Sequence, residues 1–347
     1  MSGTIYPKRA WISAAASYAG QAEALVAMVP RLWEQIGALQ PQKPADISIL
    51  GIGASHAAAA APVYRLRQDG IKAARFLASE WPLDGALSDG MVIFISQSGR
   101  SAEVVDLAAR AKGENNLAVT NYHPSPLGEV CGQGLNLGNL SDSSVSFVSF
   151  TGTMLALGLL ADYWAGRNDL ARWQDWIGAG MAQIMAADDA LRELAGQLIA
   201  CPSVDFVAPA PSASIAEEAA LMFREGPRLM ATGMETRQYL HGPMDAAGKA
   251  GHVVFGGARE ALLIDQLAEQ SDRLAYVTGL GGGTPRVPTL LTLELPVPVS
   301  EGIGFAIVGS FLAQRLTLHA ADLRGIDINE PVFIRLDTKT DRVGASA

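Results

Sequence analysis

The sequence predicts an α/β protein made of two tandem, doubly wound parallel sheets that are flanked by helices. Three observations predict this fold. Short apolar runs alternate with helix-like stretches, each run is continuous rather than alternating in polarity, and the same rhythm occurs twice along the 347 residues. Continuous runs of Val, Ile and Leu are typical of parallel strands whose two faces are both covered by helices.

The first half supplies four of these apolar runs. An Ala-rich helix follows the first run and continues to residue 68, and a Pro-rich turn follows the fourth run. Strands are expected at 47–52, 74–77, 91–95 and 117–120, and further helices at 102–112 and 151–164.

The second half repeats this rhythm, which indicates internal duplication. Strands are expected at 204–208, 252–255, 274–277 and 289–295, with a final helix from Ile303. Because a chain of this length exceeds what one core usually encloses, two domains are expected. The expected division is an N-terminal helical extension (1–43), a first domain (44–167), a helical bridge (168–200), a second domain (201–331) and a C-terminal tail (332–347).

Composition restricts the partners of the protein. The formal net charge is −9 and no run of Lys or Arg occurs, which argues against nucleic acid. Cys131 and Cys201 are too few for a disulfide framework, and the N-terminus lacks a signal-peptide pattern. The most apolar stretch, around 154–160, is shorter than the about 20 residues that span a bilayer. We therefore expect a cytoplasmic protein with no membrane partner, and the absence of metal-ligand spacing predicts no metal and no cofactor.

The clearest candidate for ligand binding is the serine loop, residues 96–101, which follows the expected strand at 91–95. Residues 96–103 read Ser-Gln-Ser-Gly-Arg-Ser-Ala-Glu and lead into a helix. Three hydroxyl groups and a glycine before a helix N-terminus suit a phosphate, because glycine lets the backbone amides approach the anion. The alternative is a serine N-cap that only starts a helix before Glu103.

A second turn, residues 51–56, follows the expected strand at 47–52 and reads Gly-Ile-Gly-Ala-Ser-His. Ligands of parallel sheets bind beyond the carboxyl ends of the strands, so we expect Ser55 to reach the same pocket. The glycine pair lacks the third glycine of a dinucleotide fingerprint, and no nicotinamide site is predicted. A single histidine in a tight turn is more often a packing residue, so His56 receives no role.

Together these segments resemble the sugar isomerase (SIS) family, especially the isomerase half of glucosamine-6-phosphate synthase and the related phosphosugar deaminases and deglycases. The resemblance covers roughly residues 44–331. Its motifs are Gly53-Ala54-Ser55, the serine loop, Arg224-Glu225-Gly226-Pro227 and Tyr239-Leu240-His241-Gly242-Pro243.

The resemblance implies a sugar-phosphate site that is shared between the two subunits of a homodimer. Glu225 would move a proton between C1 and C2 of the sugar, and His241 from the second subunit would assist ring opening. Gly53 and Ala54 would lie near the site. The phosphate would be held by Ser55, Ser96, Gln97, Ser98 and Ser101, with Gly99 letting the backbone turn close to the anion.

Glu225 and His241 also fit the chemistry on general grounds. Interconversion of an aldose and a ketose needs a base that moves a proton and a group that opens the ring. Glu225 ends a helix expected from Ser214, where the helix dipole and partial burial would raise its pKa. The alternatives are a solvated carboxylate between two arginines and a histidine that only shapes the turn before a Gly-Pro pair.

The sequence departs from the synthase pattern at two lysines. Met222 stands where the synthase has a lysine three residues before the glutamate. Leu336 stands where it has the lysine that forms a Schiff base, with Lys339 further along, so an imine intermediate is not expected. The chain opens Met1-Ser2-Gly3 without a nucleophilic cysteine, so glutamine-dependent amide transfer is not expected either.

The leading functional hypothesis is a phosphosugar enzyme that uses Glu225 as acid and base. It would be an aldose–ketose isomerase or an amino-sugar-phosphate deaminase or deglycase. The alternative is a non-catalytic sugar-phosphate sensor, which the two missing lysines favour. Residues 255–260 of the second copy contain no serine, so that copy is expected to support the structure rather than bind phosphate.

Overall fold

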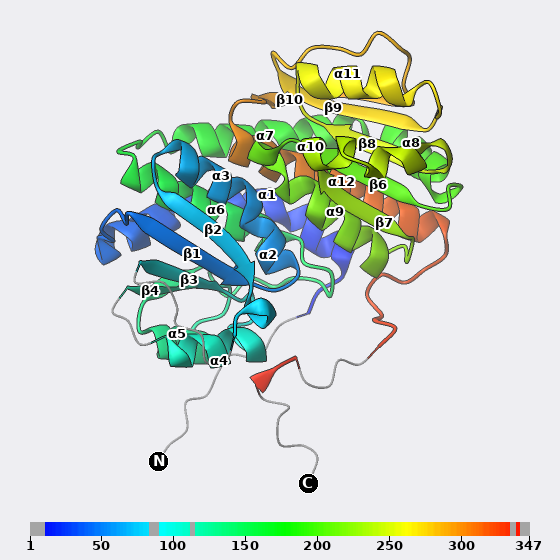
Figure 1. Cartoon of the computed structure of the whole chain (residues 1–347). Helices are drawn as coiled ribbons and strands as arrows, with labels where there is room; N and C mark the ends of the chain where they lie inside the picture. The colour runs from blue at the N-terminus through cyan, green and yellow to red at the C-terminus, as the bar shows by residue number, and fades with distance from the viewer. Residues whose placement is uncertain (1–10, 83–89, 112–114, 334–337, 341–347) are drawn as a thin grey trace.

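The computed structural model describes residues 11–82, 90–111, 115–333 and 338–340 (Figure 1). It contains two five-stranded sheets, and every strand pairing in both sheets is parallel. Helices cover these sheets, so the predicted α/β fold with two doubly wound sheets is confirmed.

The first sheet has the strand order β2-β1-β3-β4-β5. Its central strand, β3, is wholly apolar and buried, as expected for a strand covered on both faces. The strands are β1 (Asp46–Gly51), β2 (Lys72–Leu77), β3 (Met91–Ile95), β4 (Asn116–Thr120) and β5 (Gly134–Asn136).

The second sheet has the order β7-β6-β8-β9-β10, which is the same topology as the first sheet when the strands are numbered within each copy. This equivalence confirms the internal duplication that the sequence indicates. The strands are β6 (Val204–Ala208), β7 (Ala231–Glu235), β8 (Gly251–Phe255), β9 (Leu274–Leu280) and β10 (Leu291–Pro298).

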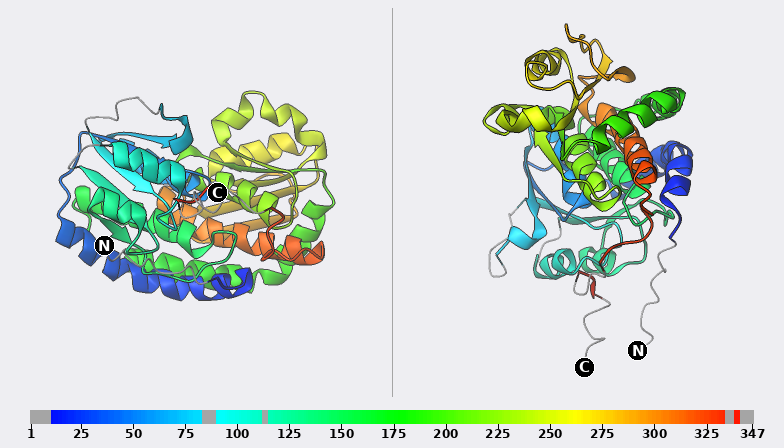
Figure 2. Two further views of the ribbon diagram at one scale, coloured as in Figure 1. Left: turned by 90° about the horizontal axis from the view of Figure 1, so that it is seen from below. Right: turned by 90° about the vertical axis from the view of Figure 1, so that its right-hand side faces the viewer.

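Twelve α-helices occur in the described part of the chain. The long helices α1 (dark blue) and α12 (orange-red) both lie on one side of the two sheets (Figure 2, left). The helices are α1 (Ala14–Leu39), α2 (Ala54–Ala58), α3 (Ala60–Gln68), α4 (Ala102–Arg110), α5 (Pro126–Cys131), α6 (Val148–Trp164), α7 (Ala171–Ala186), α8 (Asp188–Ile199), α9 (Ser214–Glu225), α10 (Thr236–Leu240), α11 (Ala258–Leu267) and α12 (Gly302–Leu323).

Two strands are absent from the sequence-based prediction, and both lie at sheet edges. β5 has three residues, and β7 reads Ala-Thr-Gly-Met-Glu, which lacks a run of β-branched residues. Gly233 in β7 serves close packing, because a Cβ atom there would lie 2.2 Å from the carbonyl oxygen of Ala216 in α9. A glycine inside a strand often marks such a close approach of another backbone, and it weakens the strand signal in the sequence.

One hydrophobic core is shared by the two sheets. It joins α1, α6, α9 and α12 to the inner faces of both sheets, and includes Ile49 of the first sheet and Phe206 of the second. Each sheet has a separate outer core, one beneath α4 and α5 that contains Leu50, and one beneath α10 and α11 that contains Val254. Adjacent residues of one strand, such as Ile49 and Leu50, therefore enter different cores, as the period of two in a strand requires.

Helix α12 (22 residues) is longer than the apolar stretch around 154–160 that the sequence analysis singled out. By length and composition it is the one helix among the described residues that could cross a membrane, but 89% of its most apolar window is buried inside the protein. It contacts α6, α7, α8 and α9, which is the environment of a core helix.

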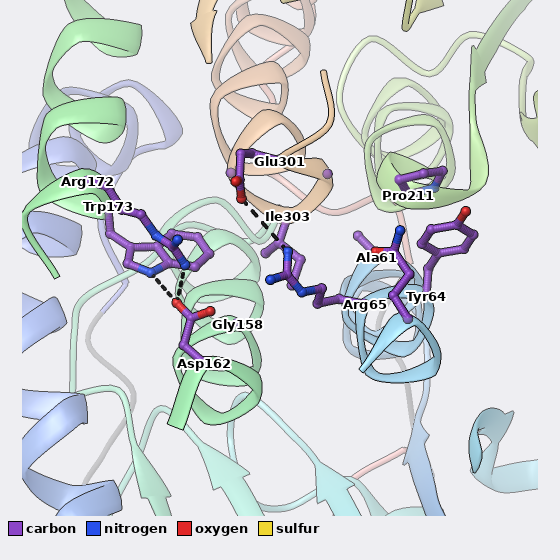
Figure 3. A pocket seen from close by; sticks show the side chains of 13 residues that line it. Ala61, Tyr64, Arg65, Gly158, Asp162, Arg172, Trp173, Pro211, Glu301 and Ile303 are labelled. Carbon is purple, nitrogen blue, oxygen red and sulfur yellow. Dashed lines mark hydrogen bonds and ion pairs between the residues drawn. The ribbon is translucent and has the colours of Figure 1, made fainter. Parts of the chain in front are cut away.

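Polar contacts also cross the junction between the two halves. Figure 3 shows Arg65 of α3 facing Glu301 beside the N-terminus of α12, with 3.9 Å between Nη1 and Oε2. Nearby, the buried Asp162 accepts hydrogen bonds from Arg172 Nη2 at 2.5 Å and Trp173 Nε1 at 2.9 Å. The cavity between these groups has a volume of about 10 Å³, so it has room for about one water molecule and none for a sugar phosphate.

A tighter ion pair joins β2 to α9. Both guanidinium nitrogens of Arg75 donate to the carboxylate of Glu217, one of them at 2.6 Å, and the same side chain donates to the carbonyl oxygen of His56 at 3.1 Å. The two paired side chains are 24% and 26% exposed. A two-pronged pair of this kind fixes α9 against the first sheet.

We predict that Arg75→Ala lowers the free energy of unfolding by about 2 kcal/mol, because Glu217 would keep a half-buried charge without its partner. Chemical denaturation at neutral pH measures this loss. The control is Arg192→Ala, which removes an ion pair to Asp322 whose side chains are 47% and 65% exposed, and which should change stability by less than about 0.5 kcal/mol. Equal losses in the two variants would contradict a special role for the Arg75–Glu217 pair.

Candidate functional site

The carboxyl ends of β1 and β3 lie side by side in the middle of the first sheet. β1 pairs with β2 on one side and with β3 on the other. In open parallel sheets with this strand order, ligands bind where the connections leave neighbouring strands in opposite directions. The turn 51–56 follows β1 and the serine loop follows β3. The topology therefore puts both predicted segments at the edge of the sheet where ligands bind.

Hydroxyl groups hold the serine loop in a compact conformation. Ser96 Oγ donates to Ser101 Oγ at 3.0 Å and accepts from the backbone N–H of Ser101 at 3.3 Å. The Oγ of Ser98 accepts from the backbone N–H of Arg100 at 3.3 Å. Ser96 and Ser98 are buried, and Ser101 is half-buried. The three predicted serines are thus brought together by the loop itself.

Gly99 and Gln97 complete this loop. Gly99 has φ +63°, and a Cβ atom on it would lie 2.3 Å from Ser125 Oγ, so the loop requires glycine at this position. The amide nitrogen Nε2 of Gln97 is buried and has no hydrogen-bond partner in the described residues. A buried donor without a partner is a rare feature in folded proteins and suits a site that receives an acceptor such as phosphate oxygen.

The C-terminal segment 338–340 pairs with the serine loop. Lys339 and Ser101 form an antiparallel bridge, and the backbone N–H of Thr340 donates to Arg100 O at 3.0 Å. Lys339 Nζ lies 3.2 Å from Ser98 Oγ and 3.4 Å from Ser101 Oγ. A cationic group therefore stands at the predicted phosphate site. The sequence analysis gave Lys339 no role, and Leu336, which it compared with the lysine of the synthase, lies outside the described residues.

The turn 51–56 begins helix α2. Gly53 has φ +58°, and the half-buried Ser55 follows in the first turn of the helix. His56 Nδ1 lies 3.2 Å from Arg75 Nη1, and burial together with this guanidinium lowers the pKa of His56. A neutral imidazole at this position can accept a hydrogen bond from the guanidinium of Arg75.

Helix α9 lies against this turn. A Cβ atom on Gly53 would be 4.0 Å from Leu221 Cδ2, and Ser214 Oγ accepts from the backbone N–H of Ala61 at 3.0 Å. The helix begins and ends as the sequence predicts, from Ser214 to Glu225. Glu225 is half-buried at its C-terminus. The second half of the chain thus packs the helix that ends at Glu225 against the turn after β1.

His241 lies at the end of α10 with an exposed side chain. Two residues earlier, the buried Tyr239 donates from its hydroxyl to Asp205 Oδ2 at 3.1 Å, and this hydroxyl is 3.3 Å from His252 Nδ1. The segment is therefore anchored to the second sheet. Among the described residues, no hydrogen bond joins the side chain of His241 or of Ser55 to the serine loop.

The corresponding turn of the second copy contains a carboxylate instead of hydroxyl groups. Glu260 Oε2 accepts from the backbone N–H of Gly257 at 2.9 Å, at the N-terminus of α11. The side chain of Glu260 is buried, and a Cβ atom on Gly256 would be 2.5 Å from it. An anion belonging to the protein thus occupies the helix N-terminus that would attract a phosphate.

Other groups in the described residues do not form a reaction centre. No group of three or more His, Cys, Asp or Glu residues there could hold a metal ion. Burial raises the pKa of the Cys131 thiol to about 12 and also raises that of Cys201, so both thiols stay protonated at neutral pH. A groove of about 490 Å³ beside Cys201 and Arg273 lies at the amino ends of the second sheet, the edge opposite to the carboxyl ends.

We predict that Gly99→Ala destabilises the protein by about 3 kcal/mol or more, because it combines a left-handed backbone with a collision at Ser125. Thermal unfolding measures the loss. The matched control is Gly70→Ala, since Gly70 has φ +84° and nothing within 4 Å of an added Cβ atom. This control should lose only about 1 kcal/mol for the backbone. The structure of the serine loop would be wrong if both variants lost the same stability.

Comparison with known proteins gives relatives for most of the chain. A search of protein-family models found no match. The chain is 24% identical over 265 residues to glutamine–fructose-6-phosphate aminotransferase (isomerizing) from Caulobacter vibrioides, a match that covers 70% of this chain and 43% of the relative. The chain thus spans about half the length of the curated relatives it matches.

Three solved structures share the fold over nearly all of the chain. The C-terminal domain of glucosamine-fructose-6-phosphate aminotransferase from Francisella tularensis has a TM-score of 0.76 at 19% identity and covers 92% of this chain and 98% of its own. Tagatose-6-phosphate ketose/aldose isomerase from Escherichia coli has a TM-score of 0.75 at 16% identity, with coverages of 94% and 99%. Glucosamine-6-phosphate deaminase from Thermotoga maritima has a TM-score of 0.72 at 18% identity, with coverages of 92% and 98%. The predicted resemblance is thereby confirmed: the chain is a relative of the isomerase half of glutamine–fructose-6-phosphate aminotransferase and has the double sugar isomerase (SIS) fold of phosphosugar isomerases.

Proposed function

We propose that the chain is a phosphosugar enzyme, an aldose–ketose isomerase or an amino-sugar-phosphate deaminase or deglycase, that does not use glutamine. The observation that supports this most directly is the cluster of Ser96, Ser98, Ser101 and Lys339 at the switch point of the first sheet. Hydroxyl donors, a cation and the N-terminus of α4 together match the charge and the acceptor atoms of a phosphate dianion. The names of the relatives support a sugar phosphate as the carrier of that dianion.

In this proposal the phosphate lies on the serine loop and reaches Ser55, Gln97 and the amides around Gly99. Glu225 takes a proton from one of the two carbons C1 and C2 and returns it to the other, through an enediol-like intermediate. This assignment is supported by α9, which ends at Glu225 and packs through Leu221 against Gly53 of the turn that holds Ser55.

The proposed working unit is a homodimer in which His241 of the partner subunit assists ring opening. The exposed side chain of His241 within one chain supports this arrangement, because an exposed imidazole can contact a second subunit. We also propose a cytoplasmic location, in keeping with Cys131 and Cys201, which are both free thiols.

A non-catalytic sugar-phosphate sensor remains the second candidate. The observation that favours it is Met222, which is fully buried and occupies the position of a lysine in the synthase. An apolar side chain there carries neither charge nor proton. The sensor and the enzyme share the phosphate site, so they differ in turnover and not in binding.

We predict that Glu225→Gln lowers kcat by about 10² to 10⁴-fold and leaves the affinity for the sugar phosphate within about threefold, because proton transfer is lost and the phosphate contacts stay. Fructose 6-phosphate and glucosamine 6-phosphate serve as probes, with isomer formation and ammonia release as readouts and calorimetry for affinity. The control is the exposed Glu269→Gln, which should behave as wild type. Unchanged turnover in Glu225→Gln would overturn the assignment, and wild-type protein that binds but never turns over would establish the sensor.

We predict that Lys339→Met weakens binding of fructose 6-phosphate by about 10 to 100-fold, because a charge-assisted hydrogen bond to the phosphate is lost. The exposed Lys72→Met is the control and should leave the affinity unchanged. Borohydride reduction of wild-type protein with fructose 6-phosphate should leave no adduct on Lys339 in peptide mass spectra if this lysine only binds phosphate. A trapped adduct would instead make it the imine-forming lysine.

A further inference from the structure

Helix α9 carries a second glutamate, Glu218, that the proposed mechanism does not use. It precedes Glu225 by seven residues, or about two helical turns, so the two carboxyl groups lie on one face of the helix. Met222 lies between them on the same face and is fully buried. Glu218 is 1% exposed, and its Oε2 atom has no hydrogen-bond partner in the described residues.

The surroundings of Glu218 are acidic. The charged groups that act on it are Glu217 and Glu225 of its own helix and Asp142 from the segment before α6, all of them carboxyl groups. Arg75 is paired with the neighbouring Glu217, and His56, which lies beside Arg75, has a lowered pKa. Burial raises the pKa of Glu218 well above its usual value, and the neighbouring carboxyl groups raise it further.

Asp142 shows how a buried carboxyl group can be supplied with hydrogen-bond donors in this protein. Its oxygens accept from Ser17 Oγ at 2.7 Å, from the backbone N–H groups of Ser143, Phe147 and Ser149, and from Ser149 Oγ. Five donors can hold a negative charge in a buried position. Glu218 is similarly buried, and its Oε2 atom has no donor among the described residues, so a negative charge there would lack the compensation that Asp142 receives.

We propose that Glu218 is a neutral carboxylic acid in the folded protein and that it is a positioning residue for Glu225. A neutral Glu218 adds no negative charge beside Glu225, so the Glu225 carboxylate can accept a proton from the sugar and the resulting carboxyl group can return it. If Glu218 ionised, repulsion between the two carboxylates would hold Glu225 in its protonated form. This role rests on the proposed function, whereas the protonation state of Glu218 does not.

The protonation state is tested without any assay of activity. The raised pKa means that the folded protein keeps a proton that the unfolded chain releases above about pH 4.5. Between about pH 4.5 and the pKa of Glu218 in the folded protein, wild type must therefore lose stability relative to Glu218→Gln as the pH rises. Over this range the unfolding constant of wild type, divided by that of Glu218→Gln, should increase about tenfold per pH unit. A protonated-carboxyl C=O band in the infrared spectrum at neutral pH should be present in wild type and absent from Glu218→Gln. Parallel stability curves together with no difference band would overturn the proposal.

The positioning role is tested by the pH profile of kcat for fructose 6-phosphate. In wild type, ionisation of Glu218 should lower kcat at alkaline pH. Glutamine stays neutral at every pH, so Glu218→Gln should keep near-wild-type turnover at neutral pH and should not show this alkaline decrease. Identical profiles would refute the positioning role even if the infrared band is present.

If wild type binds fructose 6-phosphate but never turns it over, the proposed function fails and the pH dependence of this binding replaces the rate profile. The control is Glu217→Gln, which breaks the pair with Arg75 and should lower stability without removing the infrared band.

Discussion

The shared hydrophobic core between the two sheets is the constraint on which the rest of this structure depends. Neither sheet can bury its inner face alone, because α1, α6, α9 and α12 pack against both halves and form one continuous apolar interior. Burial of apolar surface is the dominant favourable term in folding, so this shared core fixes the position of the two halves relative to each other. As a consequence, α9 of the second half lies beside the ligand edge of the first sheet. The contacts of Ser214 with the α2–α3 junction and of Arg75 with Glu217 then fix its position.

The two copies share one topology and differ in the chemistry at the end of one strand. In the first copy, the turn after β3 presents serine hydroxyls, a left-handed glycine and an amide without a partner. In the equivalent turn after β8, the buried carboxylate of Glu260 accepts from the helix N-terminus. The same backbone turn can therefore leave its N–H groups available to an anion in one copy and bond them to a side chain of the protein in the other. In the function that we propose, this difference lets a duplicated fold keep one phosphate site and use its second copy to present the helix that bears Glu225.

Helix α9 is unusual because three of its carboxyl groups have three different environments. Glu217 is paired with an arginine, Glu218 is buried without a cation, and Glu225 is half-buried at the helix end. Environment decides the protonation of a carboxyl group, since burial favours the neutral form and a cation favours the charged form. One helix can in this way supply a structural ion pair, a neutral acid and a candidate base. The buried Met222 separates the last two with an apolar side chain.

The sequence by itself determined the sheet type, the duplication, the serine loop and the bounds of α9, because apolar periodicity, glycine and helix-end signals are local properties of the chain. It did not reveal β7, since Gly233 there is selected by the approach of α9 from elsewhere in the fold. It could not assign Lys339, which meets Ser98 across 241 residues of chain. It also passed over Glu218, because a glutamate in an amphipathic helix looks like a solvated residue until the packing of two domains buries it. Burial and charge environment are sums over all neighbours in space, and only the tertiary structure decides which neighbours those are.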